Sequence, residues 1–162
     1  MNDEQPATVC TSLIEGMQSL QLSTVGVDGI PHCSYTPYLY RVPGSFYIFV
    51  SQLAAHTRHL LANRTVALMI IADEQSTPQI FARTRVHYVC EATHIPPDHP
   101  EYESVLDDYQ ERHGKMAGLL RQLPDFVLFH LHPKSGQFVM GFGKAYTLTG
   151  ANLSVFEHSR TG

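Results

Sequence analysis

Two arginines, Arg83 and Arg85, have the spacing that most directly predicts binding chemistry in this chain. They lie in Ile80–Ile95 (IFARTRVHYVCEATHI), the longest segment whose pattern is that of a single β-strand. Successive side chains of a strand point to opposite faces, so the two arginines are predicted to stand side by side. Two guanidinium groups held on one rigid strand could clamp a carboxylate or a phosphate. A solvated sheet face is the alternative interpretation of the same pattern.

A second group of polar residues follows the strand predicted over Phe46–Val50. Ser51 ends that strand, and His56 and Arg58 lie in the helix predicted over Leu53–Ala62. The first N–H groups of a helix lack partners within the helix, so a helix start beside serine and basic side chains is a potential anion site. The segment has no glycine-rich phosphate loop, and a simple capped helix explains the same residues.

The ten histidines and three cysteines raise the question of a metal site. The cysteines, Cys10, Cys33 and Cys90, have no paired metal spacing, and such a sparse set is typical of small core residues in a reducing compartment. No HExxH or zinc-finger spacing occurs among the histidines. His130 and His132 share a predicted strand face, but no third ligand is apparent, which favours solvent exposure over metal binding.

Three tyrosines, Tyr35, Tyr38 and Tyr40, lie close together in and after the strand predicted over Pro31–Leu39. Their rings could line the site of a planar ligand. The same side chains also suit packing inside a barrel or at an interface between subunits, where no ligand is needed.

Composition restricts the class of protein. A chain of 162 residues, 43% hydrophobic and 16% charged, suits one well-buried domain. Its net charge of -4 argues against a nucleic-acid binder that works through a general basic surface. No apolar run has the length of a membrane span, and the N-terminal sequence lacks the pattern of a secretory signal, so we expect a cytoplasmic protein.

The remaining periodicity predicts the elements that position these residues. Asp28-Gly29 is the turn signal of a β-hairpin, and Pro133–Gly136 is predicted as another turn. Short connections favour antiparallel pairing, and many strands in a small chain favour a closed barrel, so the fold class is α+β with a barrel core. We expect a single domain over 1–162, with an N-terminal helix within 1–20, a helical insertion at 98–123 and a tail at 149–162 anchored by Phe156. The predicted helices are Thr8–Leu20, Leu53–Ala62, Asp98–His113 and Lys115–Leu123, and the predicted strands include Pro31–Leu39, Phe46–Val50, Thr65–Ile71, Ile80–Ile95, Phe126–Leu131 and Gln137–Leu148.

Five segments form a recognisable series: LQLSTVGVDGIPHCSYTPYLY, FYIFVSQLAAHTRHLLANRTVALMII, IFARTRV, LPDFVLFHLHP and FVMGFGKAYTLTG. Together they resemble the haem-utilisation family of HugZ type, within the FMN-binding split-barrel superfamily that includes pyridoxamine 5'-phosphate oxidase. The similarity runs in order from Met17 to Phe156, and FARxR and GFGxAY are more specific to the haem branch than a generic barrel is. The resemblance implies an antiparallel split β-barrel with flanking helices, in a homodimer with ligand sites at the subunit interface.

The resemblance also implies roles for individual residues. Arg85 matches the arginine on the open side of the haem, His56 matches the histidine of the AxHxR helix, and Asp125 matches the acidic residue of the DFxLF strand. The implied reaction is oxygen-dependent opening of the porphyrin ring, with the iron held by a histidine of the C-terminal tail. That tail position aligns just beyond Gly162, while His158, which matches an earlier histidine, is the weak candidate ligand within the chain.

These implied roles agree with the chemistry of the side chains. Arg85 can donate hydrogen bonds where negative charge develops on oxygen. Asp125 can accept the free ring N–H of a ligand histidine, although a cap or turn residue after Pro124 explains it equally. The start of the Leu53 helix at Ser51, together with Arg58 and Arg83, can hold haem propionates or a flavin phosphate.

Three functions follow as competing hypotheses. The first is a haem-degrading enzyme that needs an electron donor, and haem is then both cofactor and substrate. The second is an FMN-dependent oxidoreductase, favoured by the superfamily and by the basic helix start after Ser51. The third is a haem carrier or sensor that keeps the barrel and has lost catalysis. None of them calls for a nucleic acid or a membrane.

Overall fold

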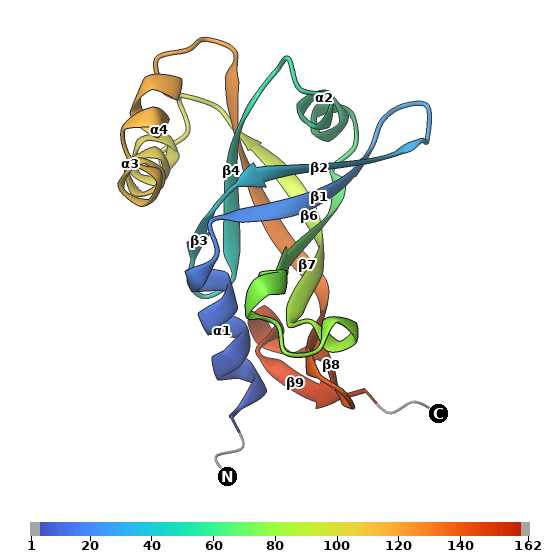
Figure 1. Cartoon of the computed structure of the whole chain (residues 1–162). Coiled ribbons are helices and arrows are strands. Elements are labelled where there is room, and N and C mark those ends of the chain that lie inside the picture. Colours follow the sequence, from blue (N-terminus) through green and yellow to red (C-terminus); the bar gives the residue numbers. More distant parts are fainter. Residues whose placement is uncertain (1–3, 160–162) are drawn as a thin grey trace.

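One antiparallel sheet of nine strands is the centre of the computed structural model, which describes residues 4–159 (Figure 1). Its path runs β2-β1-β5-β6-β7-β4-β3, and β8 and β9 continue from β7. The strands are β1 (Ser19–Val25), β2 (Pro31–Pro37), β3 (Leu39–Arg41), β4 (Ser45–Ser51), β5 (Thr65–Ile71), β6 (Arg85–Ile95), β7 (Phe126–Gly141), β8 (Lys144–Thr149) and β9 (Val155–His158). The helices are α1 (Pro6–Gly16), α2 (Ala55–Ala62), α3 (Tyr102–His113) and α4 (Lys115–Leu120), with short 3₁₀ turns at Glu74–Ser76, Ile80–Ala82 and Ala151–Leu153.

The sheet coils around its main core, so strands from both ends of the path contribute to one cluster. Leu20 and Leu22 of β1 and Phe46 and Ile48 of β4 are all buried in that cluster. The alternation predicted for the long strand is confirmed in β6, where Val86, Tyr88, Cys90 and Ala92 face the core. The α+β class and the antiparallel pairing are therefore confirmed. In the described part of the chain no helix is both long and apolar enough to span a bilayer.

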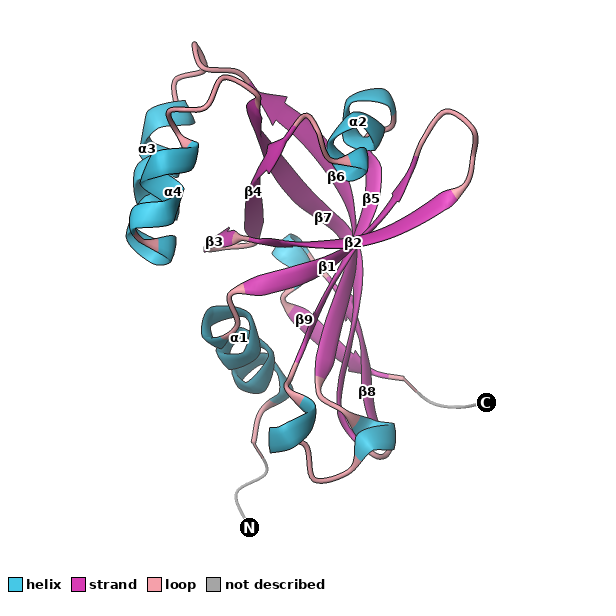
Figure 2. Cartoon of the chain, turned by 45° about the horizontal axis from the view of Figure 1, so that its top comes forward, coloured by secondary structure: helices cyan, strands magenta, loops and turns pink. Residues whose placement is uncertain are grey.

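The α3–α4 pair and α1 flank the short strand β3 (Figure 2). Arg41 of β3 donates through Nε and Nη2 to Asp108 of α3 at 2.9 and 2.6 Å. Arg112, in the last turn of α3, donates through Nη2 to the carbonyls of Glu15 and Met17, both at 2.7 Å. These bonds fix the helical insertion to the sheet and to the end of α1.

The predicted strand over Ile80–Ile95 begins too early. β6 begins at Arg85, and Ile80–Ala82 forms a 3₁₀ turn in which the Gln79 side chain accepts from the Phe81 N–H. The reason is pairing: β5 ends at Ile71, opposite Arg85, and the ladder on that side stops after the bond from the Ala72 N–H to the Thr84 carbonyl. Alternation alone cannot make a strand where no partner lies alongside.

The turn predicted at Pro133–Gly136 is wrong, because β7 runs through it without a break. The register against β6 shifts there: Cys90 pairs with Pro133 and Val89 with Ser135, which leaves Lys134 as an extra residue. A proline lacks an N–H and is tolerated at such a bulge. A Cβ on Gly136 would lie 2.7 Å from the Tyr88 ring, so glycine permits the close approach of the two strands. The hairpin turn lies instead between Gly141 and Lys144.

Other predicted boundaries shift less: the N-terminal helix ends at Gly16 rather than at Leu20, because Ser19 and Leu20 already pair with β2. Thr65–Ile71 is confirmed as β5, the Asp28-Gly29 hairpin joins β1 to β2, and the segment predicted as Pro31–Leu39 divides into β2 and β3. The tail is more ordered than predicted, since β9 pairs with β8 and Phe156 packs on the main core. Arg160–Gly162 of that tail lie outside the described residues.

A matched pair of phenylalanines tests the core. Phe138 of β7 is fully buried, whereas Phe142, four residues later, is 69% exposed. Phe138→Ala is expected to lower the free energy of unfolding by about 3–5 kcal/mol, because it leaves a cavity in a packed interior. Phe142→Ala is the control and should stay within about 0.5 kcal/mol of the wild type in urea titrations. Equal losses in the two variants would contradict this assignment of the core.

Candidate functional site

Ser51 and Asp125 come from distant parts of the sequence and meet at the end of β4. Ser51 Oγ donates to Asp125 Oδ2 at 2.7 Å and accepts the N–H of Leu53 at 3.1 Å. The Gln52 N–H donates to the Asp125 carbonyl at 2.8 Å. Ser51 therefore does not cap α2, which begins at Ala55, and instead orders the turn before it. The carboxylate of Asp125 is half-buried and held in one orientation.

His56 faces β2 rather than solvent. Its Nδ1 lies 2.8 Å from Ser34 Oγ, and in the next turn of α2 His59 Nδ1 lies 2.9 Å from Thr24 Oγ1. The rings of His59 and His32 meet edge to face with centroids 5.2 Å apart. Two hydroxyl groups thus fix the Nδ1 atoms of two histidines and leave each Nε2 for another partner. Burial lowers the pKa of His56, and the neighbouring His32 and His59 lower it further.

The first turn of α2 also contains a buried hydroxyl without a partner. Thr57 is fully buried, and its Oγ1 has no hydrogen-bond partner among the described residues. The helix begins without a side-chain cap. Arg58 is exposed and donates through Nη1 to the Leu53 carbonyl at 3.0 Å. A helix start with free N–H groups, an orphan hydroxyl and a nearby guanidinium suits an anionic group of a ligand.

The predicted pairing of Arg83 and Arg85 on one strand face is wrong, because only Arg85 belongs to β6. Arg83 donates through Nε to the Ala72 carbonyl and through Nη1 to Glu74 at 3.4 Å, so it fastens the loop between β5 and β6. Arg85 donates through Nη1 to the Arg83 carbonyl at 2.9 Å. The described residues provide no further side-chain partner for Arg85, which leaves donors available to a ligand.

Exposed apolar side chains surround the arginine end of the sheet. Phe81 is 83% exposed and Phe142 69%, and they belong to the FARxR and GFGxAY motifs. Phe142 lines a pocket of about 250 Å³ together with Gln79 and Ala82, which bracket Phe81 in the sequence. Large exposed aromatic side chains beside a guanidinium suit a flat apolar ligand with acidic groups.

The two ends of the candidate site lie far apart within one chain. Ser51 pairs with Phe126, next to Asp125, whereas Arg85 pairs with Val139 at the other end of β7. The separation along β7 is about 40 Å at the usual rise of a strand. One protomer therefore does not bring Arg85 together with Asp125.

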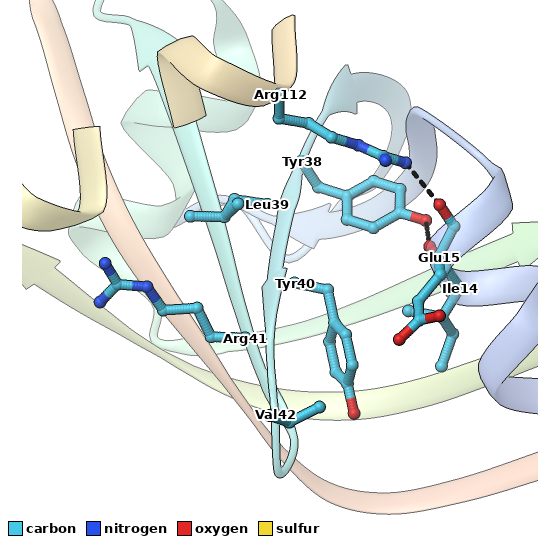
Figure 3. A pocket seen from close by; sticks show the side chains of 8 residues that line it. All are labelled: Ile14, Glu15, Tyr38, Leu39, Tyr40, Arg41, Val42 and Arg112. Carbon is cyan, nitrogen blue, oxygen red and sulfur yellow. Dashed lines mark hydrogen bonds between the residues drawn. The ribbon is translucent and has the colours of Figure 1, made fainter. Parts of the chain in front are cut away.

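The three tyrosines do not share one face. Tyr35 is exposed, whereas Tyr38 is buried and donates to the Ile14 carbonyl, and Tyr40 packs on Phe46. Figure 3 shows Tyr38 and Tyr40 beside a cavity of about 450 Å³ between α1, β3 and α3. The packing interpretation is the one these contacts support.

The other histidines and the cysteines do not gather into a metal site. No group of three or more His, Cys, Asp or Glu side chains suitable for a metal occurs in residues 4–159. His132 is exposed, as predicted, whereas His130 is half-buried and stacks on Tyr47 at 4.9 Å. Cys10 and Cys90 are buried as predicted, but Cys33 is exposed. His158 is exposed, and its Nε2 contacts the Gly143 carbonyl.

Sequence reasoning missed Ser34, Thr24 and His59. The hairpin turn at Asp28-Gly29 contains enough information to pair Thr24 with His32, and hence to place His32 and Ser34 on one face. The position of α2 over that face depends on long-range packing and has no local signal.

The histidines predict a pH dependence of stability. A folded-state pKa below the unfolded value means that the unfolded chain binds more protons as the pH falls below about 6.5. Stability is therefore expected to fall in that window, and burial also lowers the pKa of His113 and His130. His56→Asn should reduce the difference in unfolding free energy between about pH 7.5 and about pH 5.5, whereas exposed His94→Asn should leave that difference unchanged. If both variants kept the wild-type difference in unfolding free energy, the assignment of this pH dependence to His56 would be contradicted.

Comparison with known proteins places this geometry in a family. The pyridoxamine 5'-phosphate oxidase family model matches residues 9–140. The haem oxygenase HutZ of Vibrio cholerae is 38% identical over 145 residues, which cover 90% of this chain and 82% of HutZ. The chain belongs to the HutZ-type branch of the pyridoxamine 5'-phosphate oxidase family. A chloroplastic haem oxygenase of Arabidopsis thaliana, HOZ, is 26% identical over 91% of this chain and 43% of its own length.

Two solved structures have the same fold. The crystal structure of HutZ, described as a haem storage protein, matches with a TM-score of 0.79 and 31% identity, over 85% of this chain and 98% of HutZ. Campylobacter jejuni ChuZ matches with a TM-score of 0.84 and 24% identity, over 94% of this chain and 61% of ChuZ. The family resemblance predicted from the sequence is confirmed.

Proposed function

We propose that this protein binds haem and degrades it by oxygen-dependent opening of the porphyrin ring, with release of iron. The observation that carries the proposal is the 38% identity to a haem oxygenase over 90% of the chain. The motifs that the sequence shares with the haem branch include Arg85 on β6, His56 on α2 and Asp125 in the turn just before β7.

The arginine end of the sheet fits one part of a haem. Bound haem would supply the iron at which oxygen is activated. Arg85, with donors left free by its bond to the Arg83 carbonyl, would stabilise negative charge on oxygen at the open side of the ring. Phe81 and Phe142 would cover the apolar face and exclude water.

The opposite end of the sheet fits a group that orients the iron ligand, and it fits the propionates. Asp125 Oδ2 already accepts from Ser51, so the carboxylate is fixed and could accept the ring N–H of a ligand histidine, which makes that histidine more basic. His158, the candidate ligand within the described residues, lies instead at the arginine end, where it pairs with Tyr146 and its Nε2 contacts the Gly143 carbonyl. The aligned tail position lies outside the described residues. The start of α2, with Arg58 and the His56 Nε2, would hold propionate groups.

A second copy of the chain would bring the two ends together. In a homodimer the partner's opposite end would lie against Arg85, and each dimer would then contain two equivalent sites. The large separation of Arg85 and Asp125 along β7 supports this arrangement. The same proposal includes a split barrel, in which the sheet closes between its two edge strands, β2 and β3.

Reconstitution with haemin tests the function. Titration is expected to give a shifted and saturable Soret band, and addition of oxygen with ascorbate as reductant should bleach that band with release of ferrous iron. A protein that leaves the haemin spectrum unchanged would overturn haem binding. Saturable binding without bleaching would overturn the enzyme and favour a haem carrier.

FMN is the second candidate ligand, because the matching family model is that of pyridoxamine 5'-phosphate oxidase. The free start of α2 and Arg58 would suit a flavin phosphate. Quenching of FMN fluorescence on titration, with no shift of the haemin Soret band, is the result that would replace haem by FMN.

A further inference from the structure

The proposed function leaves unused the cavity of about 450 Å³ between α1, β3 and α3. Ile14, Leu39, Val42 and the rings of Tyr38 and Tyr40 give this cavity a largely apolar wall (Figure 3). A cavity of this volume is large enough for a small organic ligand. The polar groups around it therefore decide which ligand would fit.

The cavity lies at the edge of β3 rather than on one face of the sheet. All five residues of the segment 38–42 line it, although successive side chains of a strand point to opposite faces. β3 is the last strand of the sheet path and pairs only with β4. A ligand in the cavity would thus lie alongside an open strand edge.

The backbone of Tyr40 faces this open edge. The Tyr38 carbonyl points outward and accepts from His113 Nε2 of α3 at 2.7 Å, whereas the Arg41 carbonyl points towards β4 and accepts the Gly44 N–H at 3.2 Å. Backbone groups of successive residues alternate in direction along a strand, so the N–H and carbonyl of Tyr40 point outward like those of Tyr38. Neither group of Tyr40 has a partner among the described residues outside the sheet ladder.

Opposite charges lie at two positions along the edge. Arg112, next to Tyr38, uses Nη2 for two carbonyls at the end of α1, which leaves its Nε and Nη1 without a partner in residues 4–159. The Glu15 carboxylate lies beside the Tyr40 ring (Figure 3). Burial raises the pKa of Tyr40, and the neighbouring Cys10 and Glu15 raise it further, which agrees with that position of the carboxylate.

The remaining charged side chain of the wall is already engaged. Arg41 donates through Nε and Nη2 to Asp108, and its guanidinium group turns towards α3. A ligand with only negative charge would meet the Glu15 carboxylate, and a ligand with only positive charge would meet the Arg112 guanidinium. The site therefore favours a ligand that carries both charges.

We propose that the cavity binds an extended dipeptide with free termini and apolar side chains. The carboxylate of the dipeptide accepts from Nε and Nη1 of Arg112, and its ammonium group donates to the Glu15 carboxylate. Its second residue pairs with the backbone of Tyr40, as an added strand pairs with the edge of a sheet. The length also agrees, since Tyr38 and Tyr40 are about 7 Å apart along the strand and two extended residues span about the same distance.

Isothermal titration calorimetry of the intact protein with leucyl-leucine tests the ligand. We expect saturable binding of one dipeptide per chain. N-acetyl-leucyl-leucine lacks the ammonium group and leucyl-leucinamide lacks the carboxylate, so each should bind about tenfold more weakly. Absence of leucyl-leucine binding, or equal binding of the capped peptides, would overturn the proposal.

Paired variants test the site. Glu15→Gln and Arg112→Gln should each weaken the binding of leucyl-leucine about tenfold, whereas Glu111→Gln and Arg64→Gln, which remove the same charges outside the cavity, should bind as the wild type does. In Glu15→Gln the difference between leucyl-leucine and its N-acetyl form should disappear, because both changes remove the same ion pair. This variant keeps the bond from Arg112 to the Glu15 carbonyl, so its result does not depend on the packing of α3. A difference that stays at the wild-type value, or equal losses in the control variants, would place the peptide elsewhere and overturn the site.

Discussion

Arg85→Ala is expected to slow haem degradation by about 10²–10³-fold while haemin still binds. The reason is that a donor aimed at developing negative charge contributes mostly to the transition state, so its loss appears in the rate of ring opening. The rate of Arg85→Lys should lie between those of the wild type and Arg85→Ala, because a lysine keeps the charge and loses the planar fork of donors. The decay of the Soret band under oxygen and ascorbate, at saturating haemin, is the measurement.

An arginine elsewhere on the sheet provides the control for this prediction. Arg64 pairs with Glu91 at 2.8 Å on the exposed surface, and its side chain is 63% exposed. Arg64→Ala should therefore leave the rate unchanged. If Arg85→Ala also bleaches haemin at the wild-type rate, Arg85 does not act at the reacting oxygen. Binding without turnover in the wild type would instead favour the carrier.

Local patterns were sufficient where burial decides the structure. The alternation in β6, the Asp28-Gly29 hairpin and the limits of β5 follow from a half-buried sheet face and from turn chemistry, and the structure confirms them. The extension back to Ile80 failed because a strand also needs a hydrogen-bonded neighbour, which β5 does not provide beyond Ile71. The turn at Pro133–Gly136 failed because proline and glycine serve equally in a bulge.

The candidate site was predictable residue by residue but not as an arrangement. Ser51 and Asp125 were each singled out from the sequence. Only the pairing of β4 with β7 shows that the Ser51 hydroxyl donates to the Asp125 carboxylate. Ser34 has no motif of its own, yet it fixes the Nδ1 of His56. Long-range packing creates such contacts, and single-sequence periodicity contains no information about it.

Mixing two inactive variants is expected to restore activity if the site is shared between copies. Arg85→Ala and Asp125→Ala are each expected to abolish most turnover alone, because each removes one end of the site. Unfolding and refolding an equal mixture redistributes the subunits, and half of the dimers then contain one chain of each kind. Such a mixed dimer has one site with both residues intact and one with neither. About a quarter of the wild-type activity should therefore return.

The prediction depends on the distance along β7, since Arg85 pairs with Val139 while Ser51, beside Asp125, pairs with Phe126. A site within one chain would leave every chain of the mixture defective, so no activity would return. The double variant Arg85→Ala with Asp125→Ala, mixed with wild type, is the control: its mixed dimers contain one defect of each kind at separate sites, so no intact shared site forms in them. Only the wild-type dimers, about a quarter of all dimers, would then remain active, whereas a site within one chain would leave about half of the activity. Two results together identify a site that two protomers build: activity returns when the two single variants are mixed, and the mixture of double variant and wild type shows no activity above a quarter.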